Sequence, residues 1–138
     1  MKAIWILLGL VLLLVVPAVW AQSCGSLGDG YGPYDYTNAE HREERLPIVT
    51  RAHFTPQVER LERGQSGHLG GDIDYTLRAF PNHHRALDAM SRLAVREDTH
   101  KPSNMRYTVR CWFHRAKEFA PDDGMVWMLE GMHHHRLG

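Results

Sequence analysis

The sequence has little net charge and little lysine. Its 138 residues contain 16 Lys and Arg and 16 Asp and Glu, so the formal net charge is zero, and only three of the basic residues are Lys. This balance gives no support for a nucleic-acid partner or an anionic membrane surface, because binding to either needs an excess of basic groups. The 13 arginines instead favour bidentate ion pairs with carboxylates.

The sequence also lacks the motifs of common catalytic sites. The segment GQSG at residues 64–67 has its second Gly one residue too early for a nucleophile elbow. It has no phosphate-binding loop and no H-E-x2-H zinc motif. Asp72-x-Asp74 begins like a calcium loop, but Leu77 stands where the turn needs Gly. We expect both carboxylates to cap and begin a helix, and we predict no enzyme activity and no catalytic residues.

The ten histidines suggest a metal site, but their spacing does not favour one. Two ligands on one helix face need a separation of three or four residues, and no pair of histidines has either. A site between helices, for example from His114 and His134, remains open. A small periplasmic metal- or cofactor-binding protein is therefore the alternative function. The main prediction has no metal and no cofactor.

The longest apolar run lies at the N-terminus. Lys2 precedes an apolar stretch over residues 4–16, and Ala21 is a small residue suited to a cleavage position. This pattern predicts a secretory signal peptide over residues 1–21. An uncleaved anchor is the alternative, since residues 3–21 nearly reach the roughly 20 apolar residues of a membrane span. We expect a periplasmic or secreted protein without membrane contact after cleavage.

Only two cysteines are present, Cys24 and Cys111. An even number in an exported chain favours one disulfide. It would close a loop of 87 residues, worth about 4–5 kcal/mol in the loop-entropy account. Lipid attachment at Cys24 and two free thiols are the alternatives.

Residues 22–71 are predicted to form an N-terminal arm and short helices. The arm, residues 22–38, is rich in Gly and Tyr, and its tyrosines favour an ordered segment lying on a helical body over a flexible tether. A short helix from residue 40 should end before Pro47. A second should begin at Thr55-Pro56 and stop at Gly64, while residues 48–54 are ambiguous between helix and strand.

Residues 72–138 are predicted to be a helical region, and the fold class is all-α. Apolar residues recur there at steps of three and four, the spacing of one helix face. Pro81, Pro121 and the polar stretch 98–104 interrupt the pattern. The predicted helices cover residues 72–80, 83–97, 107–120 and 125–137.

The last two predicted helices carry a specific set of residues. Val109, Phe113, Ala116 and Pro121 are followed by W-x2-E-G-x2-H at residues 127–134. This arrangement resembles the tetratricopeptide repeat, in which 34-residue units of two helices share these offsets. An earlier unit begins at Leu87. The distance in sequence from Leu87 to Trp127 exceeds the 34-residue repeat period by six residues, and one insertion of six residues within 98–104 explains this excess.

The resemblance implies stacked antiparallel helix pairs and a protein or peptide partner on their concave face. It places Trp127, His134 and the helix from Leu87 to Ala94 in the core. The function predicted is an exported module for protein–protein interaction or assembly, with contacts from Arg78, Arg85, Arg92, His133 and Arg136. The pattern stops at Gly138 after the first helix of a unit, so we expect the N-terminal arm, a partner or further chain to cover that helix.

The corner at residues 80–82 is surrounded by Tyr75, Arg78, His83, His84 and Arg85. These polar groups could recognise a partner, or they could form a buried hydrogen-bond network that holds the corner. The second interpretation is favoured, because such groups are more often structural.

Overall fold

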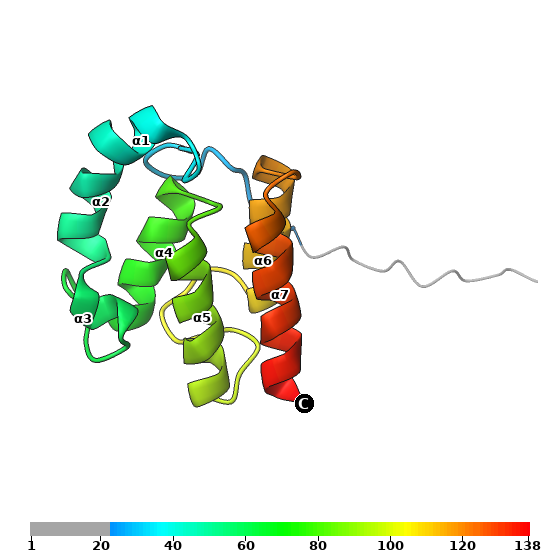
Figure 1. Cartoon of the computed structure of the whole chain (residues 1–138). Coiled ribbons are helices and arrows are strands. Elements are labelled where there is room, and N and C mark those ends of the chain that lie inside the picture. Colours follow the sequence, from blue (N-terminus) through cyan, green and yellow to red (C-terminus); the bar gives the residue numbers. More distant parts are fainter. Residues whose placement is uncertain (1–22) are drawn as a thin grey trace, which may run out of the picture.

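The computed structural model describes residues 23–138, and its regular structure is entirely helical (Figure 1). The described part has no strand, so the all-α prediction is confirmed. None of its helices has the length and apolar character that a membrane span requires. The predicted signal peptide, residues 1–21, lies outside the described residues. The helices in chain order are α1 Ala39–Glu44, α2 Leu46–His53, α3 Pro56–Glu59, α4 Leu69–Ala79, α5 His84–Arg96, α6 Val109–Phe119 and α7 Gly124–Leu137.

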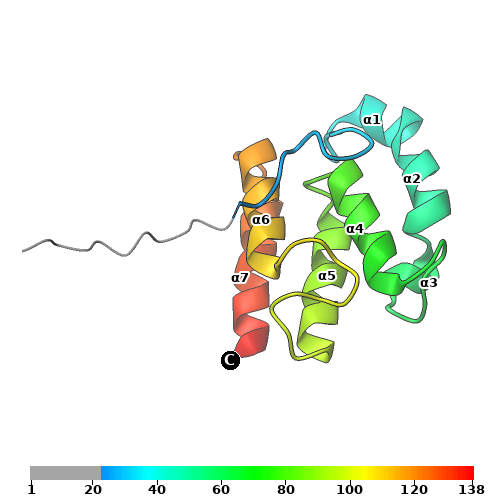
Figure 2. The same cartoon turned by 180° about the vertical axis from the view of Figure 1, so that it is seen from behind.

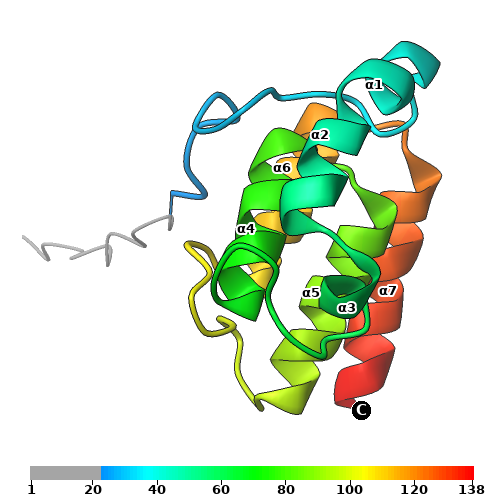
Figure 3. The same cartoon turned by 90° about the vertical axis from the view of Figure 1, so that its left-hand side faces the viewer.

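Helix α5 lies at the centre of the fold. It packs against α3 and α4 on one side and against α6 and α7 on the other, with α1 to α3 flanking α4 (Figures 1 and 3). The apolar faces of these helices meet in one core that includes Leu77, Leu87, Met90, Trp112 and Phe113, each at most 1% exposed. Burial of apolar side chains of this size is the main stabilising contribution to a helical domain.

The same helix hairpin occurs twice along the chain, first as α4 and α5 and then as α6 and α7. Helices α4 and α6 are equally long. They begin at Leu69 and Val109, while α5 and α7 begin at His84 and Gly124, so both pairs of helices are offset by the same distance in the sequence. Each hairpin turns through a short corner containing a proline, and a side chain accepts a hydrogen bond at the start of its second helix. The predicted division between residues 71 and 72 falls inside α4.

Two predicted helix boundaries are wrong. Pro47 lies in the first turn of α2, where its missing N–H has no partner to lose, so it begins a helix and does not end one. α1 already ends at Glu44, and the ambiguous stretch 48–54 is mostly helical. Helix α3 stops at Glu59, well before Gly64, and Leu61 follows it in the left-handed conformation with φ 58°.

Asp72 and Asp74 do not cap the start of α4, which begins three residues earlier at Leu69. Asp72 is buried in the first turn, where Oδ2 accepts hydrogen bonds from Gln65 N (2.6 Å) and Ser66 N (3.0 Å). Its Oδ1 lies 2.8 Å from His53 Nδ1. Asp72 therefore holds the loop before α4 against α2.

The N-terminal arm is ordered, as predicted. The disulfide between Cys24 and Cys111 attaches it to α6, so lipid attachment at Cys24 and free thiols were the wrong alternatives. The arm then crosses to α1 (Figure 2). Its tyrosines Tyr31, Tyr34 and Tyr36 pack on a small apolar cluster at the end of α4.

Arg115 holds the arm from inside the fold. Its side chain is 0% exposed, and its guanidinium donates to Cys24 O (2.9 Å), Ser26 O (3.0 Å) and Asp29 Oδ1 (2.9 Å). The Tyr107 hydroxyl donates to the other Asp29 oxygen at 2.6 Å. Burial raises the pKa of Asp29, but the hydrogen bond from Tyr107 and the charge of Arg115 outweigh it, so the pKa is lowered. Asp29 is thus ionised at neutral pH.

Candidate functional site

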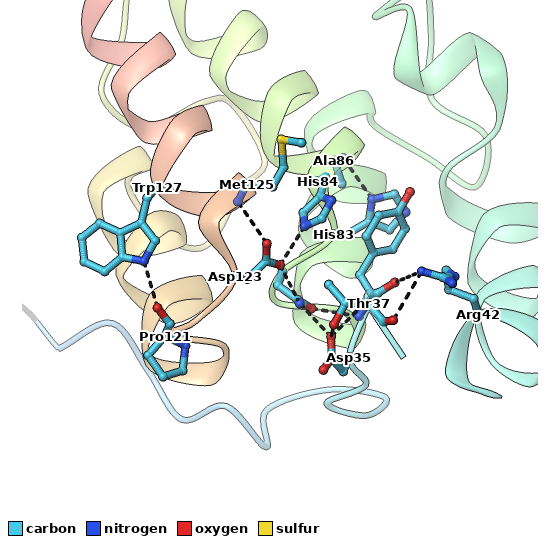
Figure 4. Close-up of polar contacts among 12 residues, drawn as sticks. Asp35, Thr37, Arg42, His83, His84, Ala86, Pro121, Asp123, Met125 and Trp127 are labelled. Carbon is cyan, nitrogen blue, oxygen red and sulfur yellow. Dashed lines mark hydrogen bonds and ion pairs between the residues drawn. The ribbon is translucent and has the colours of Figure 1, made fainter. Parts of the chain in front are cut away.

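The corners of the two hairpins lie side by side and share one hydrogen-bond network (Figure 4). The Asn82 amide donates to Asp35 Oδ1 (2.8 Å) and to Asp123 Oδ2 (3.0 Å), and its oxygen accepts from Tyr36 N (2.9 Å). His84 Nε2 lies 2.7 Å from the same Asp123 oxygen. Asn82 is fully buried and uses both amide protons and its oxygen. The network joins the arm to both corners.

His83 beside this network is uncharged. Burial lowers its pKa to about 3, its Nδ1 accepts from Ala86 N at 3.1 Å, and its ring stacks on Tyr36 at 4.3 Å. The ring caps α5 and leaves no charge for recognition. Around the corner, the structural interpretation therefore holds for His83 and His84.

The other predicted corner residues point elsewhere. Tyr75 stacks on His53 (3.7 Å), and Arg78 donates to Asp74 Oδ2 (2.8 Å) and to Asp29 O in the arm (3.2 Å). Arg85 is paired with Glu59 in α3.

The predicted partner-binding residues all have contacts within the chain. Besides Arg78 and Arg85, Arg92 donates to Asp88 Oδ2 (2.8 Å) and to Glu59 O (2.8 Å). Arg136 donates to Asp88 Oδ1 (2.6 Å) and to Ser91 Oγ (2.8 Å). His133 is only 7% exposed, with its Nδ1 2.9 Å from Ser91 Oγ. As contacts for another molecule the five remain a prediction, and Arg85 is the most exposed of them.

The contacts at Ser91 determine the protonation of His133. An arginine can only donate, so the Ser91 hydroxyl accepts from Arg136 and donates its own proton to His133 Nδ1. The imidazole therefore carries its proton on Nε2. Burial, together with the nearby charges of His134 and Arg136, lowers the pKa of His133 and keeps the ring neutral. The hydrogen bonds of Ser91 with His133 and Arg136 therefore link α5 to α7.

The outer face of α7 is the most unusual surface of the described chain. Seven large apolar residues of the described part are exposed, and five of them lie on this one helix, at 40–63% exposure: Met125, Trp127, Met128, Met132 and Leu137. The sequence placed Trp127 and His134 in the core, and that prediction is wrong, because both are exposed. The arm does not cover them either, since it runs over α6 toward α1 on the far side (Figures 1 and 2).

Trp127 is exposed but fixed in position. Its indole N–H donates to Pro121 O at 3.0 Å, and Lys117 Nζ lies 4.7 Å from the ring centroid (Figure 4 shows the first contact). Lys117 is itself held by Glu130 at 2.6 Å. A ring fixed in this way loses little freedom on binding, which is what an interface anchor needs.

A groove of about 820 Å³ adjoins this face. Its apolar lining includes Val95 from α5, Val109 and Phe113 from α6 and Leu137 from α7. Polar groups around it include Asp98, His100, Arg110, Glu130 and His134. The volume falls within the range of ligand pockets, about 300–1,000 Å³. Neither this groove nor the buried Arg115 was found from the sequence, because both depend on how separate helices meet.

The histidines form no evident metal centre in the part of the chain that the structure describes. Residues 23–138 contain no group of three or more His, Cys, Asp or Glu side chains arranged to hold a metal ion. His114 and His134, the pair considered from the sequence, are both exposed. His114 lies 3.8 Å from Glu118 on its own helix.

Comparison of the chain with known protein families, with curated proteins and with solved structures finds no match.

Proposed function

We propose that this protein is an exported helical module that binds another protein through the outer face of α7. The observation that carries the proposal is the concentration of exposed Met125, Trp127, Met128, Met132 and Leu137 on a single helix. Met125, Met128 and Met132 follow at steps of three and four and so share one side of α7, and exposed apolar surface of this kind is typical of protein interaction sites. Methionine suits such a surface, because its flexible thioether adapts to a partner.

The proposed architecture is tetratricopeptide-like, and the repetition of one hairpin at a constant offset in the sequence supports it. Export to the periplasm or secretion is part of the proposal. The disulfide supports it, because disulfides persist mainly in oxidising compartments.

Cross-linking in the native host tests the proposed function. A photoreactive amino acid at Met128 should give a discrete adduct with another protein in the exporting cells, identified by mass spectrometry. The matched control carries the same group at Glu43, which is exposed on α1. Adducts from Met128 alone are expected. Equal adducts from both positions, or none from Met128, would contradict the assignment of this face.

A further inference from the structure

We infer that the partner presents an α-helix, which lies along α7 across Gly124 and Gly131. This inference rests on the proposed function and names the partner's chemistry. It comes from a comparison between α7 and the equivalent helix α5, each the second helix of its hairpin. Because α5 begins at His84 and α7 at Gly124, these two residues correspond, and the following residues correspond in order.

The inward faces of the two helices agree. Ala86, Ala89 and Leu93 of α5 are buried, and so are their equivalents Val126, Leu129 and His133 of α7. Both helices therefore pack on the core through the same side.

The other faces differ. In α5 the residues Leu87, Met90, Ser91 and Ala94 are at most 1% exposed, because α6 and α7 also pack against this helix. Their equivalents Trp127, Gly131 and His134 are exposed, and Glu130 is half-buried. The face of α5 that is covered by helices is thus open in α7.

Charged positions of α5 have also become apolar in α7. Arg85, Asp88 and Arg92 correspond to Met125, Met128 and Met132. Residues 124–135 contain one charged side chain, Glu130, and Lys117 neutralises it at 2.6 Å. On a helix surface that faces water, charged or polar side chains are the usual residues, so the three methionines indicate that this surface of α7 is covered.

Two glycines identify a helix as the occupant. Gly124 and Gly131 are seven residues apart, so they lie on the same side of α7. Neither needs its conformation for a turn, and a Cβ at either would meet nothing within 4 Å. Glycine inside a helix is destabilising, and nothing in the described chain offsets it at Gly131. A glycine flanked by Trp127 and Met128 allows the backbone of a second helix to approach closely.

The charges beside this face do not orient the partner helix. Arg110 borders the groove near the C-terminal end of α7, but Asp98, of opposite charge, borders the same groove. Because Lys117 neutralises Glu130, the contacted face of the partner helix should be uncharged and apolar.

The test uses two display libraries of peptides about 20 residues long, enough for several helical turns. One library is built on an amphipathic helical scaffold and the other has unconstrained sequence. We expect the helical library to yield binders with apolar residues at helical spacing. Gly131→Leu should weaken these binders at least 10-fold. The control Glu43→Leu, on exposed α1, should leave them unchanged.

A stability readout separates close approach from a defect in folding. Gly131→Ala should raise the Tm by about 2–6 °C, because Ala is the better helix former, and should still weaken the binders. A lower Tm would show that the chain's own packing needs the glycine, and would overturn the inference.

Other outcomes also overturn it. Binders from the unconstrained library alone, no binders from either, or binders indifferent to Gly131→Leu would each reject a partner helix on this face. A dimer of the wild type in light scattering that Gly131→Leu abolishes would assign the face to a helix of a second copy and would overturn binding of a different protein. If the binders come from the unconstrained library alone or are indifferent to Gly131→Leu, adducts at Met128 would still support the proposed function. Loss of those adducts would reject both the partner helix and the proposed function.

Discussion

Replacing Arg115 by Met is expected to lower the free energy of unfolding by about 3–5 kcal/mol, the usual effect of removing one partner of a buried ion pair. The variant removes the cation paired with Asp29 and the hydrogen bonds that Arg115 donates to the carbonyls of Cys24 and Ser26. Unfolding in urea, followed by circular dichroism, measures the loss. Arg51→Met on the exposed surface of α2 is the control and should change stability by less than about 0.5 kcal/mol.

The stability contributed by the pair of Asp29 and Arg115 should depend on pH in one direction. The folded pKa of Asp29 is below its unfolded value, so its ionised form stabilises the fold above a pH of about 4. That stabilisation is lost as the pH falls through the folded pKa, and the wild type and Arg115→Met should converge in acid. Adding Asp29→Asn should recover part of the loss, because the unpaired charge disappears. Strictly additive effects of the two substitutions would show that the pair is not coupled.

Replacing Cys24 and Cys111 together by Ser is expected to cost about 4–5 kcal/mol, because the bridge closes a loop of 87 residues and limits the unfolded chain. The arm should stay docked in the folded variant, since Arg115 and Tyr107 still hold it. Thermal unfolding should show a lower Tm for the double variant.

Reducing agent supplies the control for the disulfide. Dithiothreitol should lower the Tm of the wild type toward that of the double variant and leave the variant unchanged. A wild type whose Tm does not respond to complete reduction, verified by mass spectrometry, would contradict the stabilising role of the bridge.

The helical hairpins could be predicted from the sequence because their signals are local. Apolar spacing, Pro81 and Pro121 act within one or two turns. The disulfide followed from the number of cysteines and the expected compartment. Pro47 misled the prediction because a proline that ends one helix and a proline that begins the next look alike locally.

The candidate site depends on contacts that no local pattern contains. Trp127 was predicted to be buried because it has the spacing of a core residue, but no described helix covers that side of α7. His133 and Arg136 looked like surface groups, yet Ser91 and Asp88, which are distant in the sequence, draw them into the interface with α5. Spacing identifies which residues share a face, and only the tertiary structure shows which face meets solvent.

Oxidative footprinting in the native cells tests most directly whether the outer face of α7 is a binding face. Hydroxyl radicals modify exposed methionine and tryptophan, and Ile48, exposed on α2 away from this face, serves as the reference for dose. The account predicts that Trp127 and Met128 are oxidised several-fold less in cells than in the purified protein, relative to Ile48. Equal relative oxidation in the two samples would show that the face is open to water in the cell and would contradict the account.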